Sequence, residues 1–144
     1  MEGIEIKLAE EDTNLEAAIR LRFQVFVGEQ SVPPEEEMDE ADAGATHAVA
    51  LHQGQVVGTG RIVGMDATTA QIGRMAVDAT WRRQGIGGRI LEFLEETARA
   101  EGASVVVLHA QEYVKSFYAA HGYRVHGETF LEVNMPHVEM RKTL

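Results

Sequence analysis

The segment best suited to chemistry is an arginine- and glycine-rich run, Arg82-Arg83-Gln84-Gly85-Ile86-Gly87-Gly88. Glycine has no Cβ, so the backbone of such a run can turn tightly and bring its N–H groups against a ligand. A helix beginning at about Gly87 would add unpaired N–H groups and a partial positive charge at the same point. Arg82, Arg83 and Arg89 carry charge of the same sign. The run therefore predicts a site for an anion such as a pyrophosphate.

Two common phosphate-binding motifs do not match this run. No Gly-Lys-Ser/Thr follows it, as the loop of nucleoside triphosphatases requires, and its third glycine is not at the spacing of the dinucleotide fingerprint. A plain turn whose glycine caps the next helix is the alternative interpretation of the run taken alone.

Charge along the chain favours one local anion site. The formal net charge is -10, so the chain as a whole repels phosphates and we expect no nucleic-acid partner. Between residues 74 and 89, however, there are four arginines and one acid. Between Glu29 and Asp42 there are seven acids and no base. This acidic run either forms a solvated loop or attracts a cationic ligand.

Composition narrows the classes of protein to consider. Hydrophobic residues make up 44% of the 144 residues and charged residues 25%, which is typical of one globular domain, residues 1–144. We find no long apolar run and no secretory signal, so we expect no membrane contact and a cytoplasmic location. The absence of cysteine excludes disulfides, thiolate metal ligands and a cysteine nucleophile. No two histidines have the spacing of a zinc site, and we expect no metal.

Hydrophobic periodicity predicts the elements that must position these residues. The predicted strands cover residues 3–9, 46–52, 55–64, 70–77, 104–109, 123–125 and 136–143. The predicted helices cover residues 13–29, 87–101 and 113–121. The order β-α-β-β-β-α-β-α-β-β predicts an α/β (α+β) fold of three layers, with a mixed sheet between helices.

Two motifs, in this order of elements, resemble those of a known superfamily. Arg82-x-x-Gly85-x-Gly87, after a strand ending Met75-Ala76-Val77, resembles the coenzyme A signature of the GNAT acetyltransferases. Phe117-Tyr118-x-x-x-Gly122-Tyr123 is similar to the segment that follows the fifth strand in that family. The resemblance covers nearly the whole chain. It implies a mostly antiparallel sheet, acetyl-coenzyme A as co-substrate and an amine as acceptor.

Both ends of the chain resemble a narrower bacterial branch of this superfamily, labelled YjcF-like or ElaA-like. The front carries Val25-Phe26-x-x-Glu29-Gln30-x-Val32-Pro33, then Glu37-x-Asp39-x-x-Asp42, then His47. The end carries Phe130-Leu131-Glu132…Pro136-His137-Val138-x-Met140. This branch supports acetyl transfer without naming an acceptor.

The resemblance implies how the cofactor is held. The pyrophosphate would bind the N–H groups of the glycine-rich turn, and the pantetheine arm would pair like an additional strand with the end of the fourth strand. The expected cofactor-binding residues are Met75, Ala76, Val77, Arg82, Arg83, Gln84, Gly85, Ile86, Gly87 and Gly88. Core packing of the Met75 and Val77 side chains is compatible with this role, because the backbone does the binding.

The resemblance also implies a direct attack of the amine on the thioester in a ternary complex, since neither a cysteine nor a Gly-x-Ser-x-Gly elbow is present. Val77 N–H is the expected oxyanion donor, and Tyr118 matches the general-acid tyrosine of the family. A tyrosine at the sheet edge is the structural alternative for Tyr118.

The acceptor amine must lose a proton, because alkylammonium groups have pKa values near 10. The candidate bases, which stay open at this point, are Glu29, Glu37, Asp39 and His137. These four residues and Gln30 form the expected acceptor site. Ion pairing with Arg61 or Arg141 is the structural alternative for the four.

Other functions fit parts of the sequence. Arg22-x-x-x-Phe26 with the acids of residues 37–42 also resembles acyl-homoserine-lactone synthases, although an expected tryptophan before the acids is missing. A non-catalytic coenzyme A sensor would keep the glycine-rich turn, but Tyr118 argues against it. The acidic run would also suit a protein acetyltransferase that docks basic peptides. We rank a small-molecule amine first, and a homodimer is common for this fold.

Overall fold

The structure is a computed structural model that describes residues 3–9, 12–37, 40–64, 66 and 68–144. Its main elements are β1 (Ile4–Leu8), α1 (Asp12–Arg22), α2 (Pro34–Glu37), β2 (Thr46–His52), β3 (Gln55–Val63), β4 (Thr69–Val77), α3 (Ile86–Ala100), β5 (Val105–Gln111), α4 (Lys115–Ala120), β6 (Arg124–Val125), β7 (Phe130–Glu132) and β8 (Met135–Thr143). A π-helical stretch, Phe23–Glu29, extends α1, and a 3₁₀ turn, Glu40–Gly44, precedes β2.

The predicted strands and helices are confirmed, with three differences. The helix predicted over residues 13–29 is α-helical only as far as Arg22 and then becomes π-helical. The acidic segment contains the short helix α2, whose first residue, Pro34, suits that position because it lacks an N–H. The strand β7 was not predicted. It forms a hairpin with β8 through Val133 and Asn134, which have positive φ angles of 46° and 62°.

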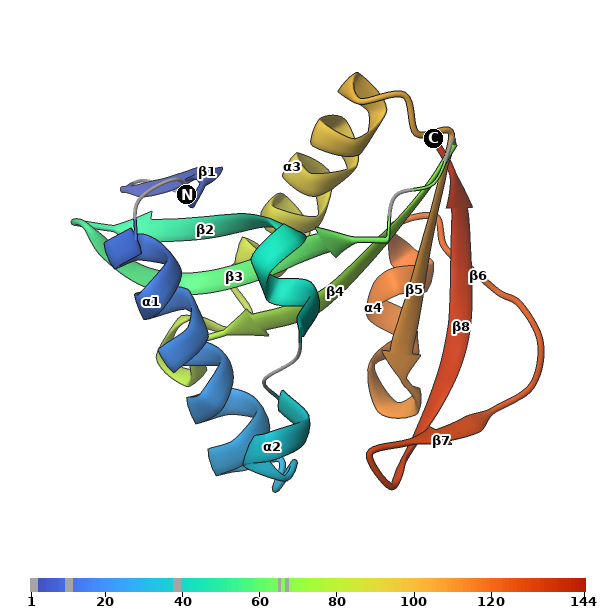
Figure 1. Cartoon of the computed structure of the whole chain (residues 1–144), viewed down its shortest axis with the longest axis horizontal. Coiled ribbons are helices and arrows are strands. Elements are labelled where there is room, and N and C mark those ends of the chain that lie inside the picture. The colour runs from blue at the N-terminus through green and yellow to red at the C-terminus, as the bar shows by residue number, and fades with distance from the viewer. Residues whose placement is uncertain (1–2, 10–11, 38–39, 65, 67) are drawn as a thin grey trace.

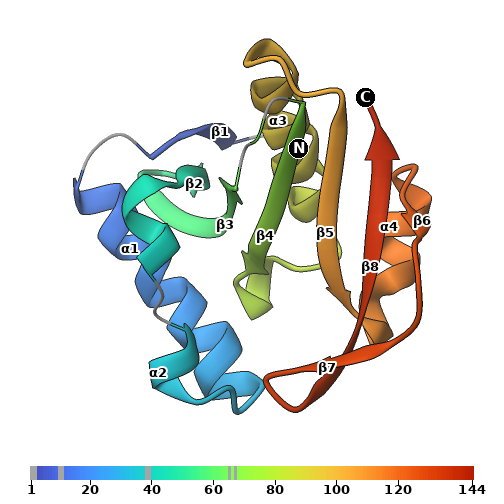
Figure 2. The same ribbon diagram turned by 45° about the vertical axis from the view of Figure 1, so that its right-hand side comes forward.

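Among the described residues, eight strands form one mixed sheet in the order β1-β2-β3-β4-β5-β8-β6, with β7 also paired to β8. Only β4 and β5 are parallel, and the other pairs are antiparallel. α1 and α2 lie on one side of the sheet and α3 and α4 on the other (Figures 1 and 2). The three-layer, mostly antiparallel fold is therefore confirmed. No described helix combines the length and apolar character needed to cross a membrane.

The parallel pair β4–β5 is short. Thr69–Gln71 pairs with Val105–Val107, although β4 continues to Val77 and β5 to Gln111. The two strands visibly diverge beyond this point (Figure 2). The edge of β4 that faces β5 is therefore left without a strand partner along its second half.

A β-bulge lies at the point where β4 leaves β5. Thr59 pairs with Ala76 and Arg61 with Gly73, so the single residue Gly60 faces both Arg74 and Met75. Arg74 has a positive φ of 51°, which is unusual inside a strand. A bulge of this kind bends its strand and increases its twist.

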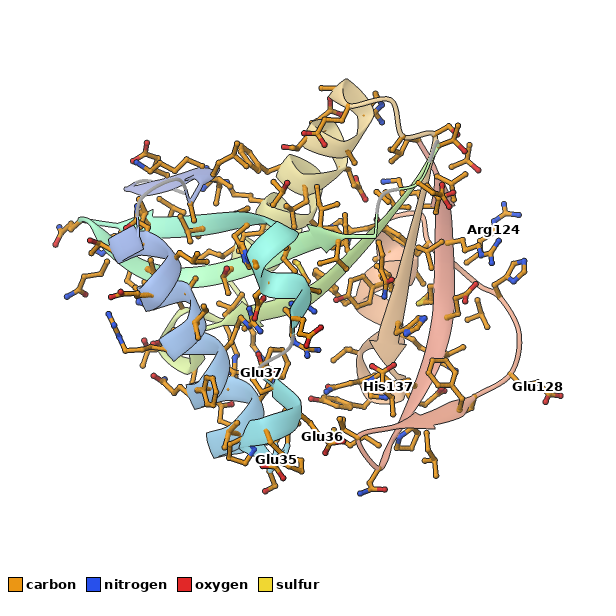
Figure 3. All side chains as sticks on the ribbon, viewed as in Figure 1. Glu35, Glu36, Glu37, Arg124, Glu128 and His137 are labelled. Carbon is orange, nitrogen blue, oxygen red and sulfur yellow. The ribbon has the colours of Figure 1, made fainter. Side chains whose placement is uncertain are left out.

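The acidic segment runs along the α1 face of the sheet. Glu35 and Glu36 of α2 are exposed, whereas the neighbouring Glu37 side chain is only 2% exposed (Figure 3). The prediction of a solvated loop therefore holds for the first two glutamates and fails for the third.

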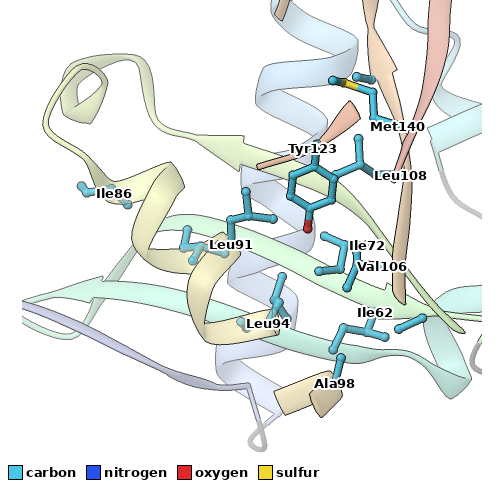
Figure 4. Close-up of a cluster of buried hydrophobic side chains, with 14 of the residues drawn as sticks. Ile62, Ile72, Ile86, Leu91, Leu94, Ala98, Val106, Leu108, Tyr123 and Met140 are labelled. Atoms are coloured by element: carbon cyan, nitrogen blue, oxygen red, sulfur yellow. The ribbon is translucent and has the colours of Figure 1, made fainter. Parts of the chain in front are cut away.

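The main core lies between the sheet and α3. Four residues that the periodicity placed on one face of this helix, Ile90, Leu91, Leu94 and Ala98, are fully buried. They meet sheet residues such as Ile62, Ile72, Val106 and Leu108 (Figure 4). Burial of each large aliphatic side chain contributes about 1.5–3 kcal/mol. The core thus fixes α3, and with it the glycine-rich turn at its start.

Gly60→Ala should destabilise the protein, because its Cβ would lie 2.5 Å from Met75 Sδ and 2.9 Å from Leu94 Cδ1. We expect a loss of about 1–3 kcal/mol in the free energy of unfolding, measured with urea. Gly73→Ala is the matched control on β4, since a Cβ there meets nothing within 4 Å. Equal stability of the two variants would contradict this account of the bulge.

Candidate active site

The first part of the site is the free edge of β4. The N–H of Asp78 donates to the carbonyl of Val57 on β3 at 2.9 Å, next to the pair formed by Val77 and Gly58. Because successive residues of a strand direct their backbone groups to opposite sides, the N–H and C=O of Val77 point away from β3. They face the side on which β5 has separated. Met75 and Ala76 precede Val77 in this strand.

The second part is the start of α3. Gly85 is the N-cap with a φ of 83°, and Arg83 also has a positive φ of 64°. The first intrahelical hydrogen bond runs from Arg89 N–H to Gly85 O at 3.1 Å. Among the described residues, no acceptor meets the N–H groups of Ile86, Gly87 and Gly88. The helix therefore begins at Ile86, one residue before the predicted start, with the free N–H groups that an anion site needs.

The glycines of this turn also allow close packing of the start of α3 against neighbouring side chains. A Cβ on Gly87 would lie 3.4 Å from the Phe117 ring and 3.9 Å from Val77 Cγ2, so the helix start adjoins the end of β4. A Cβ on Gly88 would lie 2.8 Å from His121 Nε2, so a larger residue there would have to displace the His121 ring. Ile86 is buried in the core and anchors the turn.

The arginines of this region point in three directions. Arg82 Nε donates to the carbonyl of Val77 at 2.9 Å, and its two terminal nitrogens contact the Glu29 carboxylate at 2.8 and 3.0 Å. Arg83 is exposed, as is Gln84. Arg89 donates to the carbonyl of Ile4 at 3.2 Å and so belongs to the contact with β1. Arg82 and Arg83 are therefore the two arginines of this turn whose charges could act on a bound anion.

Tyr118 of α4 packs between two aromatic rings. Its ring centroid lies 5.0 Å from that of Phe117 and 5.9 Å from that of Tyr123, both in edge-to-face geometry. Burial raises the pKa of the Tyr118 hydroxyl to about 12. In the part of the chain that the structure describes, this hydroxyl has no hydrogen-bond partner, whereas Tyr123 donates to Glu95 at 2.7 Å. Tyr118 therefore carries an available proton donor at neutral pH.

Gln30 connects the two sides of the diverging sheet. Its side-chain carbonyl accepts from Gln111 Nε2 at 2.7 Å, and its amide donates to the Tyr113 hydroxyl at 3.0 Å. Gln30 directly follows the π-helical stretch, whereas Gln111 ends β5. These hydrogen bonds link the residue after Glu29 to the end of β5 and to the turn that follows it.

His137 lies opposite Gln111 on β8 and is 5% exposed. Its Nδ1 is 2.8 Å from the carbonyl of Met135, a contact that places the ring proton on Nδ1 and leaves Nε2 unprotonated in the neutral ring. Nε2 is 3.8 Å from the Glu132 carboxylate, which also contacts His109 Nδ1 at 3.1 Å. The Glu132 carboxylate thus lies between a buried histidine and a more exposed one.

Glu37 is enclosed by arginines. Its carboxylate accepts from Arg22 Nε at 2.7 Å and lies 3.2 Å from Arg74 Nε, which belongs to the bulge of β4. Arg22 also pairs with Asp42 at 2.8 Å, and Asp42 pairs with Arg61 at 2.6 Å. This arrangement favours a structural role for Glu37, which connects α1 and α2 to the bulge, over contact with an acceptor.

Asp42 is the second carboxylate of this cluster. Burial alone would raise its pKa, but the hydrogen bonds and charges of Arg22 and Arg61 together outweigh burial and hold the pKa below its usual value of 3.8. The aspartate is therefore charged at neutral pH and contributes to stability through both arginines.

The structure thus brings some predicted residues together and separates others. Glu29, Gln30, Val77 and Arg82 lie in one connected group, and His137 joins it through Gln111. Asp39 lies outside the described residues. Sequence reasoning missed Glu132 and Gln111 as members of the site. The turn residue Asn134 between two short β-prone stretches was the one signal that could have indicated a hairpin and placed Glu132 opposite β8.

Comparison with known proteins shows the family to which the chain belongs. The family model described as acetyltransferase (GNAT) domain matches residues 8–144. The chain belongs to the GNAT acetyltransferase family. It is an acyltransferase of the N-acetyltransferase type, and the resemblance found in its two motifs is confirmed.

Two similar proteins represent the narrower branch. The uncharacterized N-acetyltransferase YjcF of Bacillus subtilis is 39% identical over 136 residues, which cover 94% of this chain and 96% of that protein. The crystal structure of Escherichia coli ElaA matches with a TM-score of 0.86 and 26% identity over 96% of this chain and 99% of that one. A GNAT family acetyltransferase from Elizabethkingia anophelis with acetyl-CoA bound shares the fold, with a TM-score of 0.75 and 16% identity over 100% of both chains.

Asp42→Asn should lower the free energy of unfolding at neutral pH by about 2 kcal/mol, because it removes the charged partner that Arg22 and Arg61 share. The folded-state pKa of Asp42 is lowered, so its contribution is present above the usual value of 3.8 and is lost as the pH falls through the lowered value. The difference between wild type and variant should therefore shrink below about pH 4. Urea unfolding across this pH range measures it.

The control for this variant is Glu40→Gln, which removes an exposed charge from the same 3₁₀ turn. We expect it to change stability by less than about 0.5 kcal/mol. An Asp42→Asn effect that is constant with pH would show that the carboxylate charge is not what stabilises the cluster.

Proposed function

We propose that this chain transfers the acetyl group of acetyl-coenzyme A to the amine of a small molecule, by direct attack in a ternary complex. The observation that carries the proposal is that the free edge of β4 at Val77 adjoins a helix start whose N–H groups lack acceptors among the described residues. Coenzyme A offers the matching parts, a diphosphate and an extended pantetheine arm with amide groups. The acetyl-CoA-bound protein of the same fold supports this choice.

The proposed cofactor site uses mainly backbone groups. The N–H groups of residues 83–88 would bind the diphosphate, helped by the partial positive charge of the helix start and by Arg82 and Arg83. The free edge of β4 at Met75 and Val77 would pair with the pantetheine arm as a neighbouring strand does, with Ala76 between them facing β3. Gly88 would contribute its N–H only, since its Cα face is occupied by His121.

Val77 N–H is the proposed oxyanion donor. It points into the gap between β4 and β5 and is fixed by the strand on its other side. A donor that is already in place when charge develops is worth about 3–4 kcal/mol in known enzymes. The bulge at Arg74 and Met75 sets the direction of this part of β4.

Tyr118 would assist the leaving sulfur. A pKa near 12 keeps its hydroxyl protonated at neutral pH. A thiol has a pKa near 8.5, so this phenol is the weaker acid by about three units and acts first as a hydrogen-bond donor to the developing thiolate. The proton that finally neutralises the sulfur can then come from the attacking nitrogen.

The acceptor side is built from Glu29, Gln30 and His137. Glu29 and His137 remain as proton acceptors, because Glu37 is enclosed by Arg22 and Arg74. The hydrogen bonds of Gln30 to Gln111 and Tyr113 fix this side of the proposed site to the end of β5. Such a fixed side-chain network would suit a small amine better than a protein surface.

A thiol-release assay tests the proposal. Purified protein would be mixed with acetyl-coenzyme A and a panel of amino sugars, polyamines, amino acids and peptides. Release of free thiol that depends on a particular amine supports the proposal. Cofactor binding without thiol release for any amine would support a non-catalytic sensor instead.

Tyr118→Phe should lower kcat by roughly 10²-fold, because it removes one donor to the charge that forms on the sulfur. Coenzyme A affinity, measured by calorimetry, should stay the same. Tyr123→Phe is the control, since its hydroxyl is held by Glu95 away from the proposed chemistry and its loss should reduce stability only. An unchanged kcat in Tyr118→Phe would remove this hydroxyl from the reaction.

The pH profile gives an independent test of the same group. Because the pKa of Tyr118 is raised to about 12, its donor is present at all lower pH values and is lost only as the pH rises through that value. The rate should therefore rise with pH as the amine loses its proton, without a decline caused by Tyr118 below about pH 10. A decline near neutral pH that disappears in Tyr118→Phe would contradict the raised pKa.

A further inference from the structure

The contact between Glu29 and Arg82 joins the two halves of the proposed site. Glu29 ends the π-helical stretch on the acceptor side, and Arg82 begins the glycine-rich turn on the cofactor side, 53 residues later. Nη1 of Arg82 lies 2.8 Å from Oε1 of Glu29, and Nη2 of Arg82 donates to Oε2 at 3.0 Å. Among the described residues, neither group has another ion-pair partner within 4 Å, although the charge of Arg82 also acts on the Asp78 carboxylate. An arginine of the proposed cofactor site is thus paired with a candidate base.

We propose that this ion pair is a switch operated by the cofactor. The diphosphate draws Arg82 away from Glu29, and the released carboxylate then binds the acceptor as an ammonium ion. The inference rests on the proposed function and adds the ion pair that couples the two halves of the site, and a cationic acceptor class.

The first support is competition for one guanidinium. Arg82 is bound at once to Glu29 and to the carbonyl of Val77, at 2.9 Å. The diphosphate of the cofactor would lie on the turn and would need the charge of Arg82. The pantetheine arm would pair with β4 and would need the backbone of Val77. Cofactor and Glu29 therefore cannot both hold Arg82 in its present position.

The second support is that the pair can open. The side chain of Arg82 is 40% exposed and that of Glu29 is 34% exposed. Exposed ion pairs contribute little to stability, and a diphosphate carries more charge than a single carboxylate. The Glu37–Arg22 pair, with 2% and 1% exposure, has no such freedom.

The third support is the place of the released carboxylate. Glu29 precedes Gln30, whose side chain contacts Gln111 and Tyr113. Without cofactor, Glu29 is neutralised and attracts no cation. With cofactor, it presents a negative charge beside the thioester site, which favours an ammonium ion.

The reaction that follows balances in atoms and charge. Glu29 takes one proton from the ammonium ion, and the free amine nitrogen bonds to the carbonyl carbon of the thioester. The carbon–sulfur bond breaks, and the sulfur leaves as a thiolate hydrogen-bonded to Tyr118. The nitrogen loses its second proton, which the thiolate gains, and Glu29 passes the first to water.

A double-mutant cycle on coenzyme A affinity tests the switch, with coenzyme A itself as the calorimetric probe and no amine present. Glu29→Gln should tighten binding about two- to fivefold, because Arg82 no longer has a competing partner. Arg82→Gln should weaken binding. In the Arg82→Gln background, Glu29→Gln should have no further effect.

The control is Glu35→Gln, which removes an equal charge from an exposed site on α2 and should leave affinity nearly unchanged. If Glu29→Gln tightens binding equally with and without Arg82, the effect is general charge repulsion and the switch is wrong. If Glu29→Gln weakens binding or leaves it unaltered in the wild-type background, the switch is also wrong. Failure of the wild-type protein to bind coenzyme A would instead overturn the proposed function.

Discussion

The parallel strands β4 and β5 are hydrogen-bonded over only three residues of β4, and the proposed site is arranged around the backbone groups that this leaves unpaired. Backbone N–H and C=O groups inside a fold require partners, because a buried group without one costs free energy. At Val77 the carbonyl is met by Arg82, a side chain that another ligand can displace. The bulge opposite Gly60 bends β4 as it leaves β5, and Gly60 is the residue that admits Met75 beneath it. A local feature of one strand thus creates the place where an extended ligand can pair with the sheet.

The acceptor side is fixed to the same bulge by buried charge. Arg74, at the bulge, contacts Glu37, and Glu37 is held in turn by Arg22 of α1. Charges removed from water are costly, and their mutual attraction offsets that cost only when the geometry is complete. Such a cluster has one arrangement, so it determines where α2 and the end of α1 lie relative to β4. The buried cluster therefore fixes the position of the free edge of β4 relative to the π-helical stretch that carries Glu29.

Much of this arrangement could be predicted from sequence, because the relevant signals are local. The turn over residues 82–88 combines glycines with arginines, and its helix shows a regular apolar face that proved fully buried. The role of Glu37 could not be predicted, since an acidic run looks solvated until Arg22 of α1 and Arg74 of β4 are placed around this glutamate. β7 is three residues long, too short for a periodic pattern. The pairing of Glu29 with Arg82 spans 53 residues and depends on the tertiary fold.

Glu29 and Glu37 show how burial decides what a carboxylate can do. Both are glutamates of the same acidic segment, and both contact arginine at hydrogen-bond distance. The Glu37 side chain is buried, so breaking its ion pair with Arg22 would leave an unpaired charge inside the protein. This ion pair is therefore a fixed structural contact. Glu29 is one-third exposed, so water and ligands can replace its arginine at small cost. The overall charge of -10 would repel an anionic cofactor at long range. A site that nevertheless takes such a cofactor needs a local cation that can move toward it, and Arg82 is the arginine of the turn whose present partner can release it.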